Sequence, residues 1–272
     1  MEIASLGSGS KGNSMYVGIN GVNILVDVGL SMKQIWIRLI SEMGVDLEDV
    51  NLILITHAHS DHVKSLHTIV NKYPHIKVVI TQETYDNYVE KSKKTIPKEN
   101  RLIISQHKVM KGGSVNIAAY RVNHDAPAYA FKITDNDTGE TYLHLADNGG
   151  IKKRDMFDKF KGMTYYALES NYDRNMELFH PTRPDLTKRR TIGYYGHTEN
   201  GDAISLATQI ITPSTRGIIF HHLSEECNTK EQAKATHEGL IRIFGNIKKF
   251  SKVKMVYAEQ DEVTILKGGV WD

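Results

Sequence analysis

The sequence predicts an α/β protein in which two mixed β-sheets pack against each other and helices lie outside. Two observations favour this fold class. Short apolar segments of strand length alternate with helical segments in both halves of the chain, and no proline- or glycine-rich linker separates the halves. Sheets covered by helices are one of the few arrangements that bury such segments. We therefore expect a single domain over residues 1–272, a length that can bury a substantial core.

The first half begins with a predicted hairpin and a predicted helix. Tyr16–Val28 holds two apolar strands around Asn20-Gly21, which favours a tight turn. Ser31 then starts a helix, because Gln34 occupies the capping-box position and Gly44 can end it. Further along, we expect strands at Asn51–Thr56 and Lys77–Thr81, a helix after His62 and a helix over Thr84–Lys93.

The second half repeats the alternation of strands and helices. Several strands are predicted between Leu102 and Asp147, two of them joined by a turn at Asp135–Gly139. A helix over Asn228–Phe244 would be capped by Asn228, with Glu231 three residues later. The remaining expected elements are strands at Thr164–Glu169, Gly217–His221, Met255–Ala258 and Glu262–Leu266, the last two closing the sheet, and a helix over Asp202–Ile211.

Composition indicates the cellular compartment in which the protein functions. The single cysteine, Cys227, allows no internal disulfide and suits a reducing cytoplasm. We find no secretory signal and no apolar run long enough to span a bilayer, so we expect a cytoplasmic protein without a membrane partner. A net charge of +2 does not by itself indicate a polyanion. A polyanion partner would be indicated only if the basic clusters lay on one face of the protein. These clusters are Lys91–Lys94, Lys188–Arg190 and Lys248–Lys254.

A dense group of metal-ligand residues follows the strand predicted at Asn51–Thr56. The segment reads Thr56-His57-Ala58-His59-Ser60-Asp61-His62, with four ligand-type side chains within six positions. Neutral imidazole and carboxylate bind zinc and similar divalent ions. A lone histidine is usually an ordinary surface or core residue, but this density after an apolar strand indicates a metal site.

The spacing also indicates two metal ions. His57 and His59 alternate along extended chain and can share one ion, whereas Asp61 and His62 point elsewhere and can serve a second. The pair needs a bridging carboxylate and distant histidines. Three candidates end strand-like segments: His124, Asp147 and His222. We expect Zn²⁺, and Mn²⁺ or iron fits the same donors.

With these residues in view, the whole sequence resembles the metallo-β-lactamase superfamily. His57-x-His59-x-Asp61-His62 is its most specific motif, and the three distant candidates follow in the family's order. The resemblance implies a four-layer αββα sandwich. It also implies that His57, His59 and His124 bind one ion, that Asp61, His62 and His222 bind the other, and that Asp147 bridges them.

Further segments resemble the YycJ/WalJ-like branch of the superfamily, to which the viral anti-Pycsar cyclic-nucleotide phosphodiesterases are related. These segments are Ser5–Ser14, Ile24–Ser31, His124–Pro127, Gly196-His197 and His222–Glu225. The chain departs from the branch at Glu169–Asp173 and Glu225–Asn228, which weakens transfer of the cellular exonuclease role. The resemblance implies a homodimer in a bacterial cytoplasm, with cellular or phage origin left open.

We predict a dinuclear phosphodiesterase that hydrolyses cyclic nucleotides such as cyclic CMP and cyclic UMP, and so blocks cyclic-nucleotide antiviral signalling. A water activated by two ions would attack phosphorus, with Asp61 orienting or deprotonating it. His197, in a small-residue loop, would contact a phosphate or protonate the leaving oxygen. Ser8 and Asn13, in a glycine-rich segment, are predicted to contact substrate, although a plain tight turn explains that segment equally well. Asp27 is interpreted as a carboxylate that orients a metal-binding histidine.

Several alternatives stay open at this point. A metal-dependent DNA exonuclease of the YycJ/WalJ kind has the same ligands and would profit from a basic groove. A thioesterase of the glyoxalase II kind also shares them. A metal-stabilised binding module without catalysis is less favoured, because such proteins usually lose a ligand and all seven are present. A flavodiiron oxidoreductase would carry glutamate at position 59, and a secreted zinc β-lactamase would carry an export signal.

Overall fold

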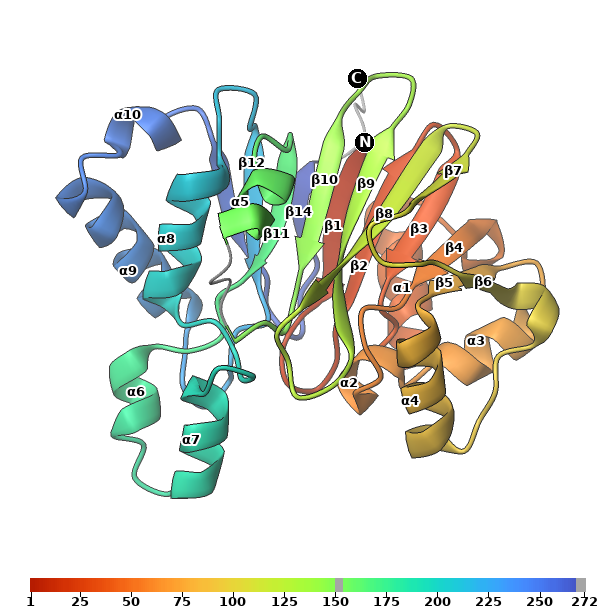
Figure 1. The fold of residues 1–272 in the computed structure, drawn as a ribbon, viewed down its shortest axis with the longest axis horizontal. Coiled ribbons are helices and arrows are strands. Elements are labelled where there is room, and N and C mark those ends of the chain that lie inside the picture. Colours follow the sequence, from red (N-terminus) through yellow and green to blue (C-terminus); the bar gives the residue numbers. More distant parts are fainter. Residues whose placement is uncertain (150–153, 268–272) are drawn as a thin grey trace.

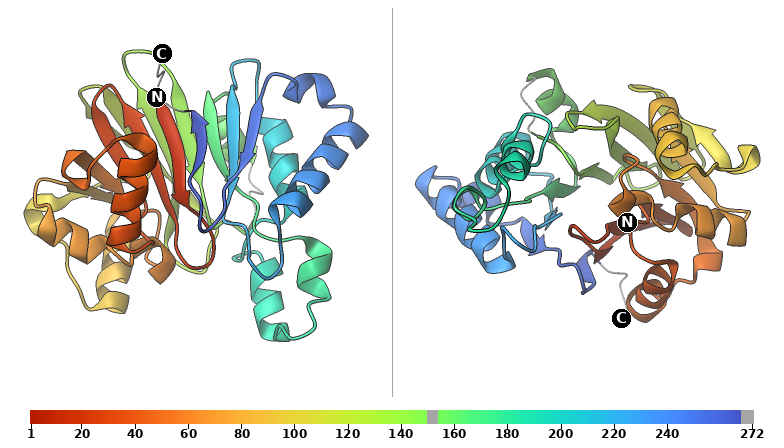
Figure 2. Two further views of the ribbon diagram at one scale, coloured as in Figure 1. Left: turned by 180° about the vertical axis from the view of Figure 1, so that it is seen from behind. Right: turned by 90° about the horizontal axis from the view of Figure 1, so that it is seen from below.

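The computed structural model describes residues 1–149 and 154–267, and it confirms the predicted fold class. Two seven-stranded sheets pack face to face (Figure 1). Helices α1–α4 cover the outer face of the first sheet, and α8–α10 lie on the opposite outer side, as the views from behind and from below show (Figure 2). Among the described helices, none is both long and apolar enough to cross a membrane.

The first sheet has the strand order β14-β1-β2-β3-β4-β5-β6. Its strands are β1 (Glu2–Gly7), β2 (Ser14–Ile19), β3 (Val22–Val26), β4 (Val50–Leu54), β5 (Lys77–Ile80), β6 (Arg101–Ile103) and β14 (Thr264–Lys267). Its helices are α1 (Met32–Met43), α2 (Ser60–Val63), α3 (Leu66–Lys72) and α4 (Gln82–Ser92), with 3-10 turns at Leu47–Asp49 and Lys98–Asn100.

The second sheet has the order β13-β12-β11-β10-β9-β8-β7. Its strands are β7 (Val109–Gly112), β8 (Val115–Val122), β9 (Ala128–Asp135), β10 (Thr141–Leu145), β11 (Tyr165–Glu169), β12 (Gly217–His221) and β13 (Lys254–Tyr257). Its helices are α5 (Arg154–Phe160), α8 (Asn200–Ile210), α9 (Lys230–Ile243) and α10 (Ile247–Phe250). Between β11 and α8, α6 (Arg174–Leu178) and α7 (Asp185–Ile192) project from one end of the molecule (Figure 1).

Three apolar layers hold the sandwich together, because side chains alternate between the two faces of each strand. In β3, Ile24 points into the layer between the sheets, whereas Leu25 packs under the helices of the first sheet. In β12, Ile219 lies between the sheets and Phe220 packs against the helices of the second sheet. The buried strands of both sheets therefore contribute to the layer between the sheets and to the two layers under the helices.

The predicted hairpin and the predicted N-capped helix are confirmed. β2 and β3 pair antiparallel around Asn20 and Gly21, which have φ values of 47° and 80°. The Ser31 side chain accepts from Gln34 N in a capping box that starts α1. Gly44, with φ 65°, ends this helix.

The helix expected after His62 is confirmed as α3, and a short helix, α2, precedes it and includes His62. Two predictions about elements were wrong in detail. α9 is capped by Thr229, whose side chain accepts from Gln232 N, whereas the Asn228 amide donates to the backbone oxygens of Ser170 and Asn171. The two final strands belong to different sheets, since β13 pairs with β12 and β14 pairs with β1.

Candidate metal centre

The segment from Thr56 to His62 leaves β4 as a tight loop that is anchored on three sides. Asp27 accepts hydrogen bonds from Thr56 N at 2.9 Å and from Thr56 Oγ1 at 2.7 Å. Backbone hydrogen bonds join Asn13 N to Asp61 O and Val28 N to His62 O, both at 2.8 Å. The four ligand-type side chains of this loop are therefore held by backbone contacts as well as by each other.

Gly29 is required where this loop passes the turn after β3. A Cβ atom at Gly29 would lie 1.5 Å from the carbonyl oxygen of Asp61 and 2.8 Å from Asn13 N. Both neighbours are backbone atoms, so neither can move aside without shifting the loop.

Gly29→Ala is therefore expected to destabilise the fold by at least about 1–3 kcal/mol and to reduce the metal bound per chain, because the clash displaces Asp61. Thermal unfolding and elemental analysis would check both effects. Gly239→Ala in α9 is the matched control, because its Cβ would meet nothing within 4 Å and should stabilise the helix by roughly 0.5–1 kcal/mol. Equal, small effects of the two substitutions would contradict the close packing of the loop.

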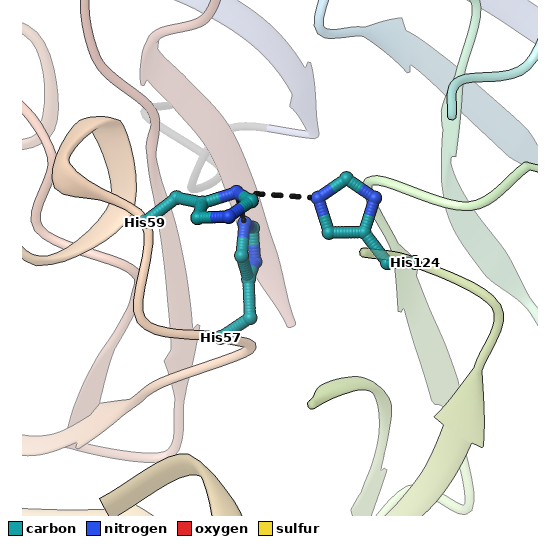
Figure 3. A group of neighbouring side chains, drawn as sticks. All are labelled: His57, His59 and His124. Atoms are coloured by element: carbon teal, nitrogen blue, oxygen red, sulfur yellow. Dashed lines mark hydrogen bonds between the residues drawn. The ribbon is translucent and has the colours of Figure 1, made fainter. Parts of the chain in front are cut away.

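A first group of donor atoms consists of three imidazoles. His57 Nε2 lies 3.1 Å from His59 Nδ1, and His124 Nε2 lies 3.2 Å from the same nitrogen (Figure 3). His124 comes from the end of β8 in the second sheet, whereas the other two follow β4. In tetrahedral zinc sites the ligand nitrogens lie roughly 3.3 Å apart. The three histidines thus present their nitrogens at the separation that one bound cation needs.

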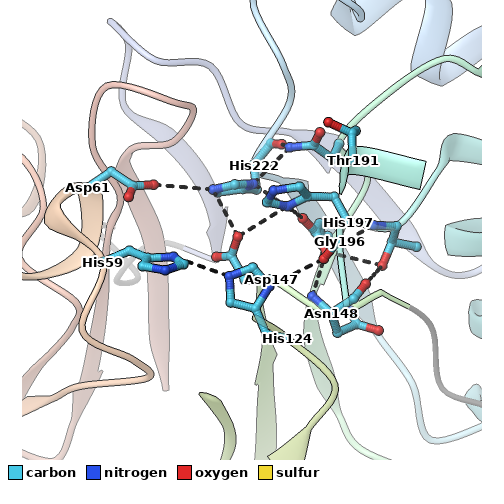
Figure 4. A network of polar contacts seen from close by, with 12 residues as sticks. His59, Asp61, His124, Asp147, Asn148, Thr191, Gly196, His197 and His222 are labelled. Atoms are coloured by element: carbon cyan, nitrogen blue, oxygen red, sulfur yellow. Dashed lines mark hydrogen bonds and ion pairs between the residues drawn. The ribbon is translucent and has the colours of Figure 1, made fainter. Parts of the chain in front are cut away.

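A second group lies beside the first and mixes carboxylate with imidazole. Asp61 Oδ2 is 3.3 Å from His62 Nε2 and 3.6 Å from His222 Nε2. Figure 4 shows Asp61, His222 and Asp147 converging on one point between the two sheets. The structure thus brings all seven predicted ligands together from loops that follow β4, β8, β10 and β12.

Asp147 lies between the two groups. Its Oδ2 atom is 3.0 Å from His62 Nε2 and 4.0 Å from His57 Nε2, and its Oδ1 atom is 3.5 Å from His222 Nε2. Asp147 Oδ2 and His222 Nε2 are buried and form no hydrogen bond of normal geometry within the described residues, only these close approaches to other candidate ligand atoms. Buried polar atoms normally have partners. These donors, and the mixture of imidazole and carboxylate around them, fit two divalent cations with Asp147 shared.

Backbone strain marks the same place. Asp27, Asp147 and His222 have φ values of 60°, 46° and 61°, in the left-handed region that side chains other than glycine rarely adopt. Such conformations cost of order 1–3 kcal/mol each and concentrate at functional sites. All three residues either belong to the second group or contact it. The strained backbone conformation therefore orients the side chains of this group.

The outer nitrogens of the candidate ligands are also fixed. His62 Nδ1 lies 2.7 Å from Asp27 Oδ2, His222 Nδ1 lies 3.3 Å from Glu169 Oε1, and His124 Nδ1 lies 3.3 Å from Gly196 O. With a metal bound, an acceptor on the outer nitrogen would favour the tautomer whose inner nitrogen is unprotonated, and it orients the ring toward the metal. Asp27 therefore contacts a candidate ligand in the way the sequence suggested.

Electrostatics differ between the two groups. Burial opposes charge on His222, but Asp147, Asp61 and Glu169 raise its pKa to about 10. In the first group, burial and the neighbouring His124 lower the pKa of His59 to about 4. Negative charge is therefore concentrated around the second group, where the carboxylates of Asp147 and Glu169 are 2% and 1% exposed. Buried carboxylates are costly unless a cation compensates them.

His197 lies at the edge of the second group. The loop after α7 presents it, with Gly196 packed so closely that a Cβ there would lie 2.1 Å from Thr191 O. His197 Nδ1 is 2.7 Å from Glu169 Oε1 and 3.2 Å from Asp147 Oδ1. Although burial opposes it, Glu169 and Asp147 raise the pKa of His197 to about 9. The ring stacks on His222 at 5.3 Å between centroids (Figure 4).

Ser8 and Asn13 are buried beside the centre and are engaged within the chain. Ser8 Oγ donates to Asn13 Oδ1 and accepts from His222 N, both at 2.8 Å. Asn13 Nδ2 donates to Gly9 O at 3.0 Å and lies 3.3 Å from Asp61 Oδ2. These contacts hold the Asp61 loop against His222, and the predicted contact of Ser8 and Asn13 with substrate stays a prediction.

Sequence reasoning missed two acidic residues of the centre. Glu169 ends β11 and contacts both His197 and His222. Asp125 Oδ1 lies 3.3 Å from His59 Nε2 and 3.3 Å from His124 Nε2. Glu169 could have been found from the sequence, because an acid at the end of a buried apolar strand lies at the same edge of the sheet as the expected ligand His222.

Known proteins resemble this chain in sequence and in fold. Residues 7–130 match the Metallo-beta-lactamase superfamily. The chain is 34% identical over 235 residues to "Exodeoxyribonuclease YycJ" of Bacillus anthracis, covering 86% of each. It is 35% identical over 69 residues to "Anti-Pycsar protein Apyc1" of Paenibacillus xerothermodurans, covering 23% of this chain and 26% of that protein.

Among solved structures, the metallo-beta-lactamase fold protein YhfI from Bacillus subtilis superposes with a TM-score of 0.68 at 14% identity, covering 97% of this chain and 98% of that one. At that identity the likeness concerns the fold alone.

Proposed function

The chain belongs to the metallo-beta-lactamase superfamily and is a metal-dependent hydrolase, and on this basis we propose that it hydrolyses phosphodiester bonds of DNA from a strand end. The cyclic-nucleotide substrate predicted from the sequence becomes the second candidate. The main support for the proposal is the position of the basic clusters in the structure, which could not be judged from the sequence.

Two of the three basic clusters flank the metal centre. Arg190 in α7 donates to Asp125, the carboxylate that contacts His59 and His124. On the other side, Lys91 and Lys94 line a pocket together with His59. Helices α4 and α7 reach the same end of the molecule in two opposite views, whereas the third cluster surrounds α10 (Figures 1 and 2). Positive charge on both sides of the centre suits a polyanionic strand.

The extent of sequence similarity supports the same choice. The exodeoxyribonuclease relative matches over most of both chains, whereas the anti-Pycsar relative matches over about a quarter. The departures from the branch pattern lie around Glu169, Asn171 and Asn228, and the structure gives these side chains positioning contacts. They therefore weigh less against a nuclease than the sequence alone suggested.

In the proposed mechanism, His57, His59 and His124 would hold one divalent ion, Asp61, His62 and His222 would hold another, and Asp147 lies within reach of both groups. When bound, the ions activate water and stabilise the phosphoryl oxygens. Asp61 orients the attacking water, as an acceptor that is partly open to solvent. His197 protonates the leaving oxygen, and Glu169 holds its Nδ1 so that the opposite nitrogen faces the substrate.

Cyclic nucleotides are the second candidate. Tyr194 and Tyr195 follow α7, pack edge-to-face at 4.9 Å and are 39% and 58% exposed. Exposed aromatic rings near a phosphodiester site can stack on a base. A compact substrate of this kind does not require the basic residues on the opposite side.

Incubation of the zinc- or manganese-loaded protein with end-labelled duplex and single-stranded DNA, cyclic CMP, cyclic UMP and cyclic AMP would test the proposal. We expect chelator-sensitive release of mononucleotides from DNA ends, with cyclic nucleotides opened much more slowly. Rapid opening of cyclic nucleotides with intact DNA would overturn the proposal in favour of the second candidate. The identity of the metal, the homodimer and the cytoplasmic location stay predictions.

A further inference from the structure

A pocket of about 430 Å³ opens beside His59, between α2, α3 and α4. We call it the lysine pocket. Its polar lining is His59, Ser60, Lys64, His67, Lys91, Ser92 and Lys94, and Tyr88 lies at its wall. None of the described residues that line it is acidic.

The three lysines of this pocket lack compensating charge. Lys64, Lys91 and Lys94 are exposed, and the ion pairs formed within the described ranges provide no carboxylate for any of them. Among the lysines that the structure describes, four do form ion pairs, for example Lys230 with Glu259 at 2.9 Å. Three unpaired ammonium groups around one hollow repel each other unless an anion binds there.

A buried hydroxyl supplies a second, independent sign of a ligand. Tyr88 is 1% exposed, and its hydroxyl has no hydrogen-bond partner among the described residues. A buried hydroxyl without a partner costs free energy. Phosphate oxygens accept hydrogen bonds from hydroxyl and ammonium groups alike, so an anion in this pocket would use donors that the chain itself leaves unused.

The lysine pocket adjoins the metal centre through a shared side chain. His59 presents Nδ1 to the first donor group and also lines the pocket. A substrate whose reacting phosphodiester lies at the metal centre can therefore reach the pocket with a neighbouring group. A cyclic mononucleotide has a single phosphate and would leave the pocket empty.

We propose that the lysine pocket is a subsite for a second phosphate of a nucleic-acid strand, adjacent to the phosphodiester that is hydrolysed. This inference rests on the proposed function and adds that the enzyme recognises at least two consecutive phosphates. Lys64, Lys91 and Lys94 bind the phosphate by charge, and Tyr88 donates a hydrogen bond to it.

The test compares Lys64→Ala/Lys91→Ala/Lys94→Ala with a control of equal charge change, Lys111→Ala/Lys248→Ala/Lys252→Ala, whose lysines are exposed and outside the pocket. Binding of the metal-loaded protein to a short fluorescein-labelled DNA strand with phosphorothioate linkages is followed by anisotropy. The pocket variant should bind about 10- to 100-fold more weakly at low salt, and the slope of log K against log salt should become shallower by about 1–2. The control should change binding less than about twofold.

Rates of hydrolysis on two substrates distinguish a defect in the subsite from a defect in the metal centre. On bis(p-nitrophenyl) phosphate, which has one phosphodiester, the pocket variant should keep its rate, whereas its kcat/KM on DNA should fall about 10- to 100-fold. Equal losses on both substrates, or equal losses in the control variant, would overturn the subsite. If the wild-type protein hydrolyses neither substrate, the proposed function fails, and the binding comparison still decides whether the pocket holds a strand.

Tyr88→Phe should affect stability and DNA binding in opposite directions. Removing a buried hydroxyl without a partner should leave the melting temperature unchanged or raise it. Binding of the phosphorothioate strand should nevertheless weaken about 3- to 10-fold, because one hydrogen bond to the phosphate is lost. Unchanged binding in this variant and in the triple-lysine variant would refute the proposal.

Discussion

Replacing both Asp61 and His62 with alanine is expected to leave one bound ion per chain and to lower the hydrolytic rate roughly 10²- to 10⁴-fold. The two residues supply half of the second donor group, and Asp61 has the most exposed side chain in it. The first group uses three other histidines and should keep its ion. Elemental analysis after dialysis and the rate on DNA would check the two effects together.

His75→Ala/Asp137→Ala is the matched control, because both side chains are exposed and lie outside the donor groups. It should keep two ions and the full rate. Since Asp27 would lose its contact with His62 in the double variant, Asp61→Asn serves as a milder second variant that removes only the charge. Two ions per chain with an unchanged rate in both variants would rule out the assignment of the second group.

Replacing His197 with glutamine is expected to lower kcat on DNA about 10²- to 10⁴-fold, the usual contribution of a general acid. The loss should nearly vanish on bis(p-nitrophenyl) phosphate, because p-nitrophenolate leaves without a proton. The metal content should stay at two ions, since the other contacts of Asp147 and His222 are kept. Steady-state kinetics on the two substrates and elemental analysis would measure this contrast.

His107→Gln provides the control for this substitution, because His107 is exposed at the turn before β7. An equal loss of rate on both phosphodiesters would instead assign His197 to positioning of Asp147. A variant with full activity on DNA would remove His197 from the mechanism altogether.

Local features of the centre were predictable from the sequence, and features that depend on long-range pairing were not. The spacing from His57 to His62 is local, so a tight loop after one strand was enough to bring these residues together. The distant candidates were found because His222 and Asp147 end apolar runs, and the resemblance fixed their order. The partition of the last two strands between two sheets depends on pairing of β14 with β1, more than 250 residues away in sequence, and no local pattern records it.

The errors have similar physical causes. Asn228 and Thr229 are adjacent and both can cap a helix, so local chemistry could not choose between them. The structure uses the Asn228 amide to join the backbone after β11, which leaves Thr229 for the cap. Helices α6 and α7 were not predicted, because Leu178 in α6 is 43% exposed and Leu186 in α7 is 80% exposed. Their apolar residues face outward, so periodicity gives no indication of a buried stripe.

The division of the donor atoms between the two sheets also has a consequence during synthesis on the ribosome. The loop after β4 emerges early with four of the seven donor side chains, but neither donor group can be completed by that part of the chain. The first group waits for residue 124 and the second for residue 222. A growing polypeptide therefore carries neither complete donor group until most of it has been translated, so hydrolysis is delayed until both sheets are present.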